Sequence, residues 1–251
     1  MEIIIGKGLK SKSMQKPGHY NNIIAFIEAL NNAKIPYIVI RNYDNLLEDA
    51  LYMEGHGDID LLCANSIELA KKIHAFPQEF HIKNGVEDGV HYYVFINGAY
   101  CSLDLRYLGD GYYCEKWEED LLKNREKHNG FYVPSSTDYF YSLIYHAIFQ
   151  KNKFSKEYQE RLEKMAKDLH IKLQGNTLSD FVHLLEKHME ERGYTYVYPK
   201  DKYVPFKKKY IQNENLLVVD KQLKRQHFAF HTKVACIEFL VKIKHRLFGK
   251  K

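Results

Sequence analysis

The sequence contains no long apolar run, and its few cysteines follow no recognisable pattern. No stretch approaches the roughly 18 to 20 apolar residues that span a bilayer, so we expect no transmembrane helix. The four cysteines form neither a C-x-x-C pair nor a regular spacing, which disfavours zinc sites and disulfide frameworks. The amino-terminal segment Met1–Gly6 is too short and too acidic for a secretory signal. These absences predict a cytoplasmic protein.

A large excess of charge of one sign is also missing. The formal net charge is +5 over 251 residues, and much of it comes from the C-terminal segment. A nucleic-acid-modifying enzyme should carry a broad basic surface and bind with steep salt dependence, so that class is disfavoured. A local anionic partner fits this charge distribution better. The length suits one large domain or two small ones.

Hydrophobic spacing predicts a mixed first half and a mostly helical second half. The dipeptide Asn97-Gly98 predicts a hairpin with a type I′ turn, because both residues tolerate positive φ. The elements expected before residue 134 are a helix over 19–34, strands over 37–41 and 57–63, a helix over 65–76, and a hairpin of 91–96 with 99–107. The helices expected after it are 135–150, 156–169 and 179–192. We therefore predict an α/β (α+β) fold, with one domain over 1–133 and a helical domain over 134–251.

Three aspartates interrupt two of the predicted strands. Asp58 and Asp60 share one face of the first strand, and Asp104 shares a face with Arg106 on the second. If the two strands are adjacent, three carboxylates meet at one point and repel one another unless a cation lies among them. Oxygen ligands of this kind suit Mg²⁺ or Mn²⁺, so the pattern predicts a metal-dependent phosphoryl-transfer site. The alternative is that the alternating acids mark the solvent face of an edge strand.

The order of these elements resembles the nucleotidyltransferase superfamily, whose core looks like the palm of DNA polymerase beta. The resemblance covers roughly residues 19 to 110. The segment Ile40-Arg41-Asn42-Tyr43 followed by Gly57-Asp58-Ile59-Asp60-Leu61-Leu62 is similar to bacterial nucleotidyltransferase-like proteins associated with capsule and other surface-polysaccharide genes. More distantly, it resembles the choline-phosphate and fukutin-related transferases. The resemblance implies a nucleotidyltransferase-type mixed sheet with flanking helices.

The resemblance also implies roles for the three acids. In two-metal sites the ions lie about 3.5 to 4 Å apart and stabilise the attacking and leaving oxygens of a transferred phosphoryl group. Asp58 and Asp60 would bridge both ions, and Asp104 would hold one and accept the proton of the attacking hydroxyl. The substrate would be a nucleotide or a nucleotide-activated small molecule, with a glycan as one expected acceptor. Gly57, beside the first acid, would contribute to substrate binding.

One position departs from the superfamily. Its members usually carry Gly-Ser or Gly-Gly after the first strand, where backbone amides bind the phosphates, and here Arg41-Asn42 occupies that place. Arg41 either binds phosphate or is an ordinary surface arginine. Arg106 either binds phosphate or forms a structural salt bridge with Asp104. The departure favours a donor other than a nucleoside triphosphate.

Two further features leave alternatives open. His146 and Lys151, in the first helix of the second half, either face the substrate or belong to the core and its surroundings. Residues 232–251 combine apolar residues at helical spacing with many basic ones. This segment either lies on an anionic membrane surface, which would make the protein peripheral to the inner face of the membrane, or docks on the core.

These observations lead to three hypotheses. The first is a Mg²⁺-dependent transferase that moves a nucleotidyl or phosphate-bearing group to a hydroxyl or phosphate acceptor in surface-glycan biosynthesis. The second is a polyol-phosphate or choline-phosphate transferase that uses a CDP-linked donor. The third, of another class, is a non-catalytic scaffold that binds a nucleotide or a partner.

Overall fold

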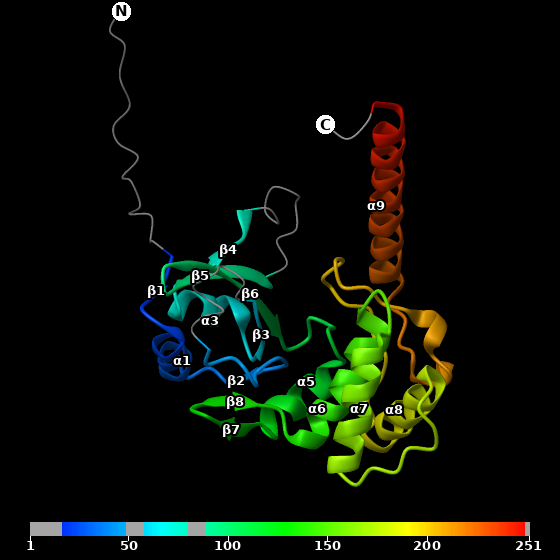
Figure 1. The fold of residues 1–251 in the computed structure, drawn as a ribbon, viewed down its shortest axis with the longest axis horizontal. Coiled ribbons are helices and arrows are strands. Elements are labelled where there is room, and N and C mark those ends of the chain that lie inside the picture. The colour runs from blue at the N-terminus through cyan, green and yellow to red at the C-terminus, as the bar shows by residue number, and fades with distance from the viewer. Residues whose placement is uncertain (1–16, 49–57, 80–88, 249–251) are drawn as a thin grey trace, which may run out of the picture.

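A mixed sheet forms one side of the molecule and a group of helices forms the other (Figure 1). The computed structural model describes residues 17–48, 58–79 and 89–248. The sheet runs in the order β1-β5-β6-β3-β2, and β4 pairs with β5. Its strands are β1 (His19–Tyr20), β2 (Tyr37–Val39), β3 (Asp58–Cys63), β4 (Phe76–Pro77), β5 (His91–Ile96) and β6 (Ala99–Tyr107). The expected mixed α/β class with flanking helices is confirmed.

The predicted β5–β6 hairpin is present with its expected turn. Asn97 and Gly98 both have positive φ, of 54° and 76°, as a type I′ turn requires. β6 then pairs in parallel with β3, and β3 pairs antiparallel with β2. The two strands that carry the acids are therefore neighbours, as the site hypothesis required.

Residue alternation divides the sheet between two apolar cores. Ile59 and Leu61 face the core that contains α1 (Ile23–Asn32) and α3 (Ser66–Lys72). Leu62, on the opposite face, belongs to the core of the helical half. Asp58 and Asp60 alternate with Ile59 and Leu61, so they point toward the helical half. This alternation positions the candidate site between the sheet and the helices.

The three helices predicted after residue 134 are present near their predicted boundaries, as α6 (Ser136–Tyr145), α7 (Lys156–Asp168) and α8 (Leu178–Arg192). The helix α5 (Glu115–Lys123) and the short strands β7 (Glu126–His128) and β8 (Phe131–Val133) precede them and were not predicted. Gly193 ends α8 with a φ of 69°, in the left-handed region that favours glycine. The expected helix over 135–150 changes to a π-helical turn, η1 (His146–Gln150), in its last part. The predicted division of the chain into two domains at residue 133 stays a prediction. One apolar core contains residues from both sides of that position.

Two predicted helices are shorter than expected. The first starts at Ile23, because the Asn22 side chain caps it by accepting a hydrogen bond of 2.8 Å from the Ala25 N–H. The residues before it form β1 instead. The second helix ends at Lys72, and Phe76–Pro77 pairs with β5 as β4. Backbone pairing with the sheet outweighed the helical apolar pattern at both places.

The chain ends in a long helix, α9 (Lys221–Phe248), which extends away from the body in Figure 1. The short 3-10 turns η2 (Lys208–Tyr210) and η3 (Glu214–Leu216) precede it. Within the described residues, no helix is both long enough and apolar enough to cross a membrane. The four cysteines are all free thiols.

Candidate functional site

The parallel pairing of β3 with β6 brings the predicted carboxylates together. Asp60 is the direct register partner of Asp104, and Asp58 is opposite Ser102. Paired residues on neighbouring strands lie on the same side of a sheet, with strands about 4.8 Å apart. The structure therefore places Asp60 and Asp104 side by side on one face of the sheet, with Asp58 two residues before Asp60 on the same strand.

The electrostatics of Asp58 reflect this crowding. Asp58 is exposed at the first position of β3, yet the burial of its carboxyl group and the negative charges of Asp60 and Asp104 raise its pKa to about 6. The positive charges of Arg41 and Lys151 act in the opposite direction. The cluster therefore disfavours a third negative charge, and a cation placed among these carboxylates would relieve the repulsion.

Arg41 binds to the acidic cluster directly. It follows β2, and its Nη2 donates a hydrogen bond of 2.7 Å to Oδ1 of Asp60. Its Nη1 donates to the Tyr112 hydroxyl and lies 3.2 Å from Nδ1 of His146. Only 11% of the Arg41 side chain is exposed, so it is not an ordinary surface arginine.

Arg106 links the sheet to the chain beyond α8. Its Nη2 donates to Oδ2 of Asp104 at 3.2 Å, so the predicted salt bridge is present. Its Nη1 donates to Oδ2 of Asp201 at 2.8 Å. The guanidinium also lies 4.6 Å from the ring centroid of Tyr112, a cation–π contact. Arg41 reaches the same ring at 5.6 Å, so two cations share one aromatic residue.

Asp201 belongs to the site although sequence reasoning did not identify it. It is 1% exposed, and the N–H of Tyr203 donates to its Oδ1 at 2.9 Å, which fixes the carboxylate within its own turn. The Nε2 of His91 lies 3.6 Å from Oδ2 of Asp201 and 3.8 Å from Oδ1 of Asp104. In the sequence, Asp201 stands between two lysines, which is typical of a solvated loop and gives no signal of burial.

His146 lies in the wall of the site rather than in a purely apolar core. Its Nδ1 lies 2.9 Å from the Tyr112 hydroxyl and 3.1 Å from Oε1 of Gln150. Gln150 in turn donates to the carbonyl oxygen of Tyr112 at 2.7 Å. Burial, together with the charges of Arg41 and Lys151, holds the pKa of His146 well below its usual range. The imidazole is therefore neutral near pH 7, and π-helical turns such as η1 often occur at functional sites.

Most of these groups line a pocket of about 210 Å³; Asp104 is among them, whereas Asp58 and Asp60 are not. Lys151, predicted as a substrate ligand, lines it and is exposed at the end of η1. The residues that line the pocket are Arg41, His91, Asp104, Arg106, Tyr112, His146, Gln150, Lys151, Asp201, Tyr203, Val204 and Pro205. Asn42, also predicted, is exposed with a φ of 58° and does not line it. Gly57 lies outside the described residues.

The donor chemistry of the carboxylates fits a hard divalent cation. Each of Asp60 and Asp104 gives one oxygen to an arginine, and Asp58 receives no hydrogen bond from the described part of the chain. Carboxylate oxygens and a local excess of negative charge are what Mg²⁺ or Mn²⁺ requires. Over residues 17–48, 58–79 and 89–248, no group of three His, Cys, Asp or Glu residues is close enough to form a complete metal site. Metal binding would therefore have to draw oxygens away from the arginines.

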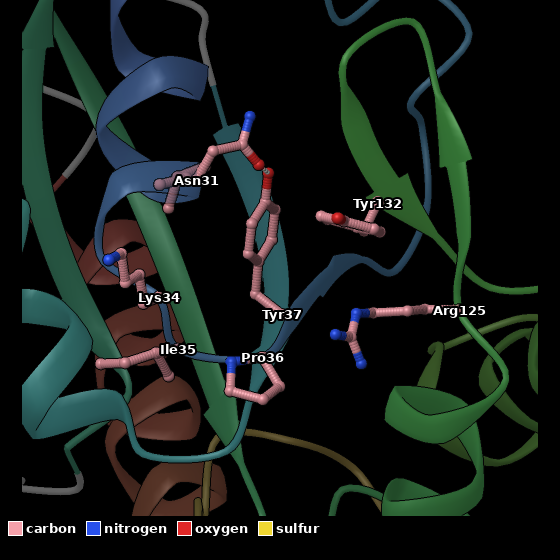
Figure 2. A pocket seen from close by; sticks show the side chains of 8 residues that line it. Asn31, Lys34, Ile35, Pro36, Tyr37, Arg125 and Tyr132 are labelled. Atoms are coloured by element: carbon pink, nitrogen blue, oxygen red, sulfur yellow. Dashed lines mark hydrogen bonds between the residues drawn. The ribbon is translucent and has the colours of Figure 1, made fainter.

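A second pocket, of about 170 Å³, lies beside the end of α1 and the start of β2. Figure 2 shows Arg125 and Tyr132 facing Tyr37 across it, with Asn31 and Lys34 on the α1 side. The Tyr37 hydroxyl donates to Oδ1 of Asn31 at 2.9 Å, and the Arg125 guanidinium lies 5.0 Å from the Tyr132 ring centroid. Among the described residues that line this pocket there is no carboxylate.

Comparison of the chain with protein-family models, with curated proteins and with solved structures found no match.

Proposed function

We propose that this protein is a Mg²⁺-dependent transferase of nucleotidyltransferase fold. It would move a nucleotidyl or phosphate-bearing group from a nucleotide-activated donor to a hydroxyl or phosphate acceptor. One observation carries the proposal: Asp60 and Asp104 are paired across two parallel strands, and Asp104 lines a pocket together with two arginines. The further assignment to surface-glycan biosynthesis on the cytoplasmic side of the membrane rests on the resemblance alone.

Asp58, Asp60 and Asp104 are the residues that would hold the metal. A bound divalent cation would supply Lewis-acid stabilisation of the phosphate oxygens. Oδ1 of Asp104 is not bonded to Arg106, and Nε2 of His91 lies 3.8 Å from it, beyond hydrogen-bond distance, so this oxygen can accept the proton of an acceptor hydroxyl. This proton transfer would make the hydroxyl oxygen a stronger nucleophile toward phosphorus.

The basic side chains of the pocket would orient the phosphate groups. Arg41 and Arg106 are held in place by carboxylates and by the Tyr112 ring, so little side-chain entropy is lost when they meet an anion. Lys151 adds a third positive charge at the exposed side of the pocket. The three basic side chains favour a substrate that carries at least one phosphate. The neutral His146 can contribute a hydrogen bond without adding charge.

The guanidinium of Arg41 favours two alternatives. Arg41 stands after the first strand, where superfamily members usually present backbone amides, and it donates to Asp60. This difference supports a transferase that takes a CDP-linked polyol or choline phosphate. The same ion pair, with that of Arg106 and Asp104, neutralises two carboxylates without any metal. That arrangement also suits a non-catalytic protein that binds a nucleotide or a partner.

Calorimetric titration tests the proposal and separates the alternatives. CTP, ATP and a CDP-alcohol would each be titrated with and without Mg²⁺ into the wild type, into Asp58→Asn and into Arg125→Gln, which alters only the second pocket. We expect metal-dependent binding of one ligand class, retained in Arg125→Gln and lost in Asp58→Asn. Preference for the CDP-alcohol would select the second hypothesis, and metal-independent binding that Asp58→Asn retains would select the scaffold.

A further inference from the structure

The first turns of α9 are attached to the body, and the segment they contact is the one that carries Asp201. Nε2 of His227 donates to the carbonyl oxygen of Pro199 at 2.6 Å, and the His227 ring lies 5.7 Å from Tyr198. The Phe230 ring makes an edge contact with the Tyr203 ring, with 4.9 Å between the ring centroids. His227 is 4% exposed, so the base of the helix is anchored.

Beyond this base, large apolar side chains of α9 face solvent. Phe239 is 64% exposed and Leu240 is 62% exposed, values far from those of a helix docked on a core. Ile237 and Val241 are exposed by 50% and 46%. Figure 1 shows the helix leaving the body along its length. Ile237, Leu240 and Val241 are spaced three and four residues apart and share one side of the helix, whereas Phe239 lies on the opposite side. Exposed apolar side chains that share a face in this way often mark an interaction site.

The charge of α9 identifies the kind of surface that it fits. Within its 28 residues the helix has a single acidic residue, Glu238. Its basic residues are Lys221, Lys224, Arg225, Lys233, Lys242, Lys244 and Arg246. A second copy of the same helix would bring these positive charges together, which disfavours self-association. An anionic lipid surface satisfies both requirements, since it attracts lysines and accepts apolar side chains at the boundary of headgroups and acyl chains.

We propose that α9 lies in the surface of an anionic phospholipid membrane, with Ile237, Leu240 and Val241 inserted at the acyl boundary. The basic side chains stay among the headgroups, because long lysine and arginine stems allow their charged ends to reach the polar layer. No helix in the described residues could cross a bilayer, so α9 lies on the membrane rather than through it. This assignment does not depend on the activity proposed for the pocket.

Vesicle flotation of the full chain tests the proposal. Vesicles of phosphatidylcholine alone would be compared with vesicles that also contain phosphatidylglycerol, at low and high salt. We expect binding to the anionic vesicles only, weakened by salt. Leu240→Ser with Val241→Ser should reduce binding by about tenfold or more, because the apolar contribution is lost. Both side chains are exposed, so the body should remain folded, and its thermal unfolding provides the check.

Charge variants with a matched control complete the test. Lys224→Gln and Lys233→Gln should each weaken vesicle binding by about fivefold, the effect of one lysine near an anionic surface. Lys164→Gln and Lys167→Gln are equally exposed on α7 and should have no effect. Equal binding to neutral vesicles, or no binding at all, would overturn the proposal. A dimer in light scattering that the Leu240→Ser and Val241→Ser substitutions abolish, without vesicle binding, would instead assign this surface to a second copy of the chain.

Discussion

Two pockets described above are similar in size and contain the same kinds of residue, but their charged groups come from different parts of the chain. One is about 210 Å³ and the other about 170 Å³, and each contains arginine beside tyrosine. In the larger pocket, carboxylates from β6 and from the segment after α8 meet the arginines. In the smaller one, Arg125 donates to the carbonyl oxygen of Leu122 and stacks on Tyr132.

This difference distinguishes the larger pocket, a candidate functional site, from the smaller pocket, which needs no functional explanation. The Arg125 guanidinium donates to the carbonyl oxygen of Leu122, three residues earlier in the chain. No carboxylate is among the described residues that line its pocket. Arg106 is bonded to carboxylates that lie on both sides of it in the sequence, which takes tertiary structure to assemble. Buried charges are costly unless they are paired, so such an assembly needs a reason beyond stability. Opposite charges converging from separate segments therefore mark the candidate site better than a pocket or an arginine alone.

The largest expected effect concerns activity. Asp104→Asn should reduce turnover by about 10³-fold or more, because it removes a group that would hold the metal and accept the proton. Asn31→Ala, in the smaller pocket, should leave turnover within about twofold, since no proposed step uses that pocket. Steady-state rates with the substrate identified by calorimetry provide the measurement. Equal losses in the two variants would remove the distinction between the pockets.

The next effect concerns stability. Arg106→Ala leaves Asp201 buried without its partner, and this should lower the free energy of unfolding by about 3 kcal/mol. Arg125→Ala loses a hydrogen bond to the main chain and a cation–π contact, and about 1 kcal/mol is expected. Urea unfolding of both variants beside the wild type gives the two values. A larger loss in Arg125→Ala would contradict the comparison.

A smaller effect is expected from removing single hydroxyl groups. Tyr112→Phe keeps the ring between the two arginines but removes the hydroxyl that contacts Arg41 and His146, and about 1.5 kcal/mol should be lost. Tyr37→Phe removes one hydrogen bond to Asn31, a neutral partner, and about 1 kcal/mol or less is expected. Thermal unfolding of the two variants under the same conditions distinguishes these values. A reversed order would show that the Tyr112 network is not the more strongly coupled one.

The smallest effect is a change in pH dependence. The pKa of Asp58 is raised to about 6, so between pH 4 and pH 6 the folded protein binds more protons than the unfolded chain, and its stability falls as the pH rises. Asp58→Asn cannot ionise, so its stability relative to the wild type should rise from pH 4 to pH 7. Stabilisation of the wild type by Mg²⁺ should increase over the same range, because the carboxylate must be ionised to bind it. A stability difference that is flat with pH would show that the pKa of Asp58 is not raised in the folded protein.

Local patterns were sufficient to predict most of the fold. The Asn97-Gly98 turn, the strand alternation around Asp60 and the C-terminal end of α8 each depend on neighbouring residues, and each was predicted correctly. Alternation also placed the acids on one face, which is why the carboxylates of the site were found. The extent of the helices before Ile23 and after Lys72 could not be predicted, because pairing with the sheet determined it.

The rest of the site depends on contacts between distant segments. Tyr112 and His91 are ordinary aromatic residues in the sequence, and only the packing of the sheet on the helices brings them to the carboxylates. The residues next to Asp201 in the sequence show no apolar pattern that would signal burial. Its partner Arg106 belongs to the other half of the chain, so the pairing could not be predicted from local sequence. Sequence spacing therefore identified the carboxylates of the sheet but not the groups that complete the pocket.

The bond between Arg106 and Asp201 also has a consequence for the order of folding. It joins positions 95 residues apart, whereas Asp104 reaches β5 through a two-residue turn. Closing a long loop costs more entropy and is slower than forming a hairpin, so we expect the paired strands to form first and the Asp201 segment to dock late. Until it docks, Arg106 has only Asp104 as an ionic partner. The pocket should therefore acquire its final charge balance in one of the last steps by which the chain becomes native.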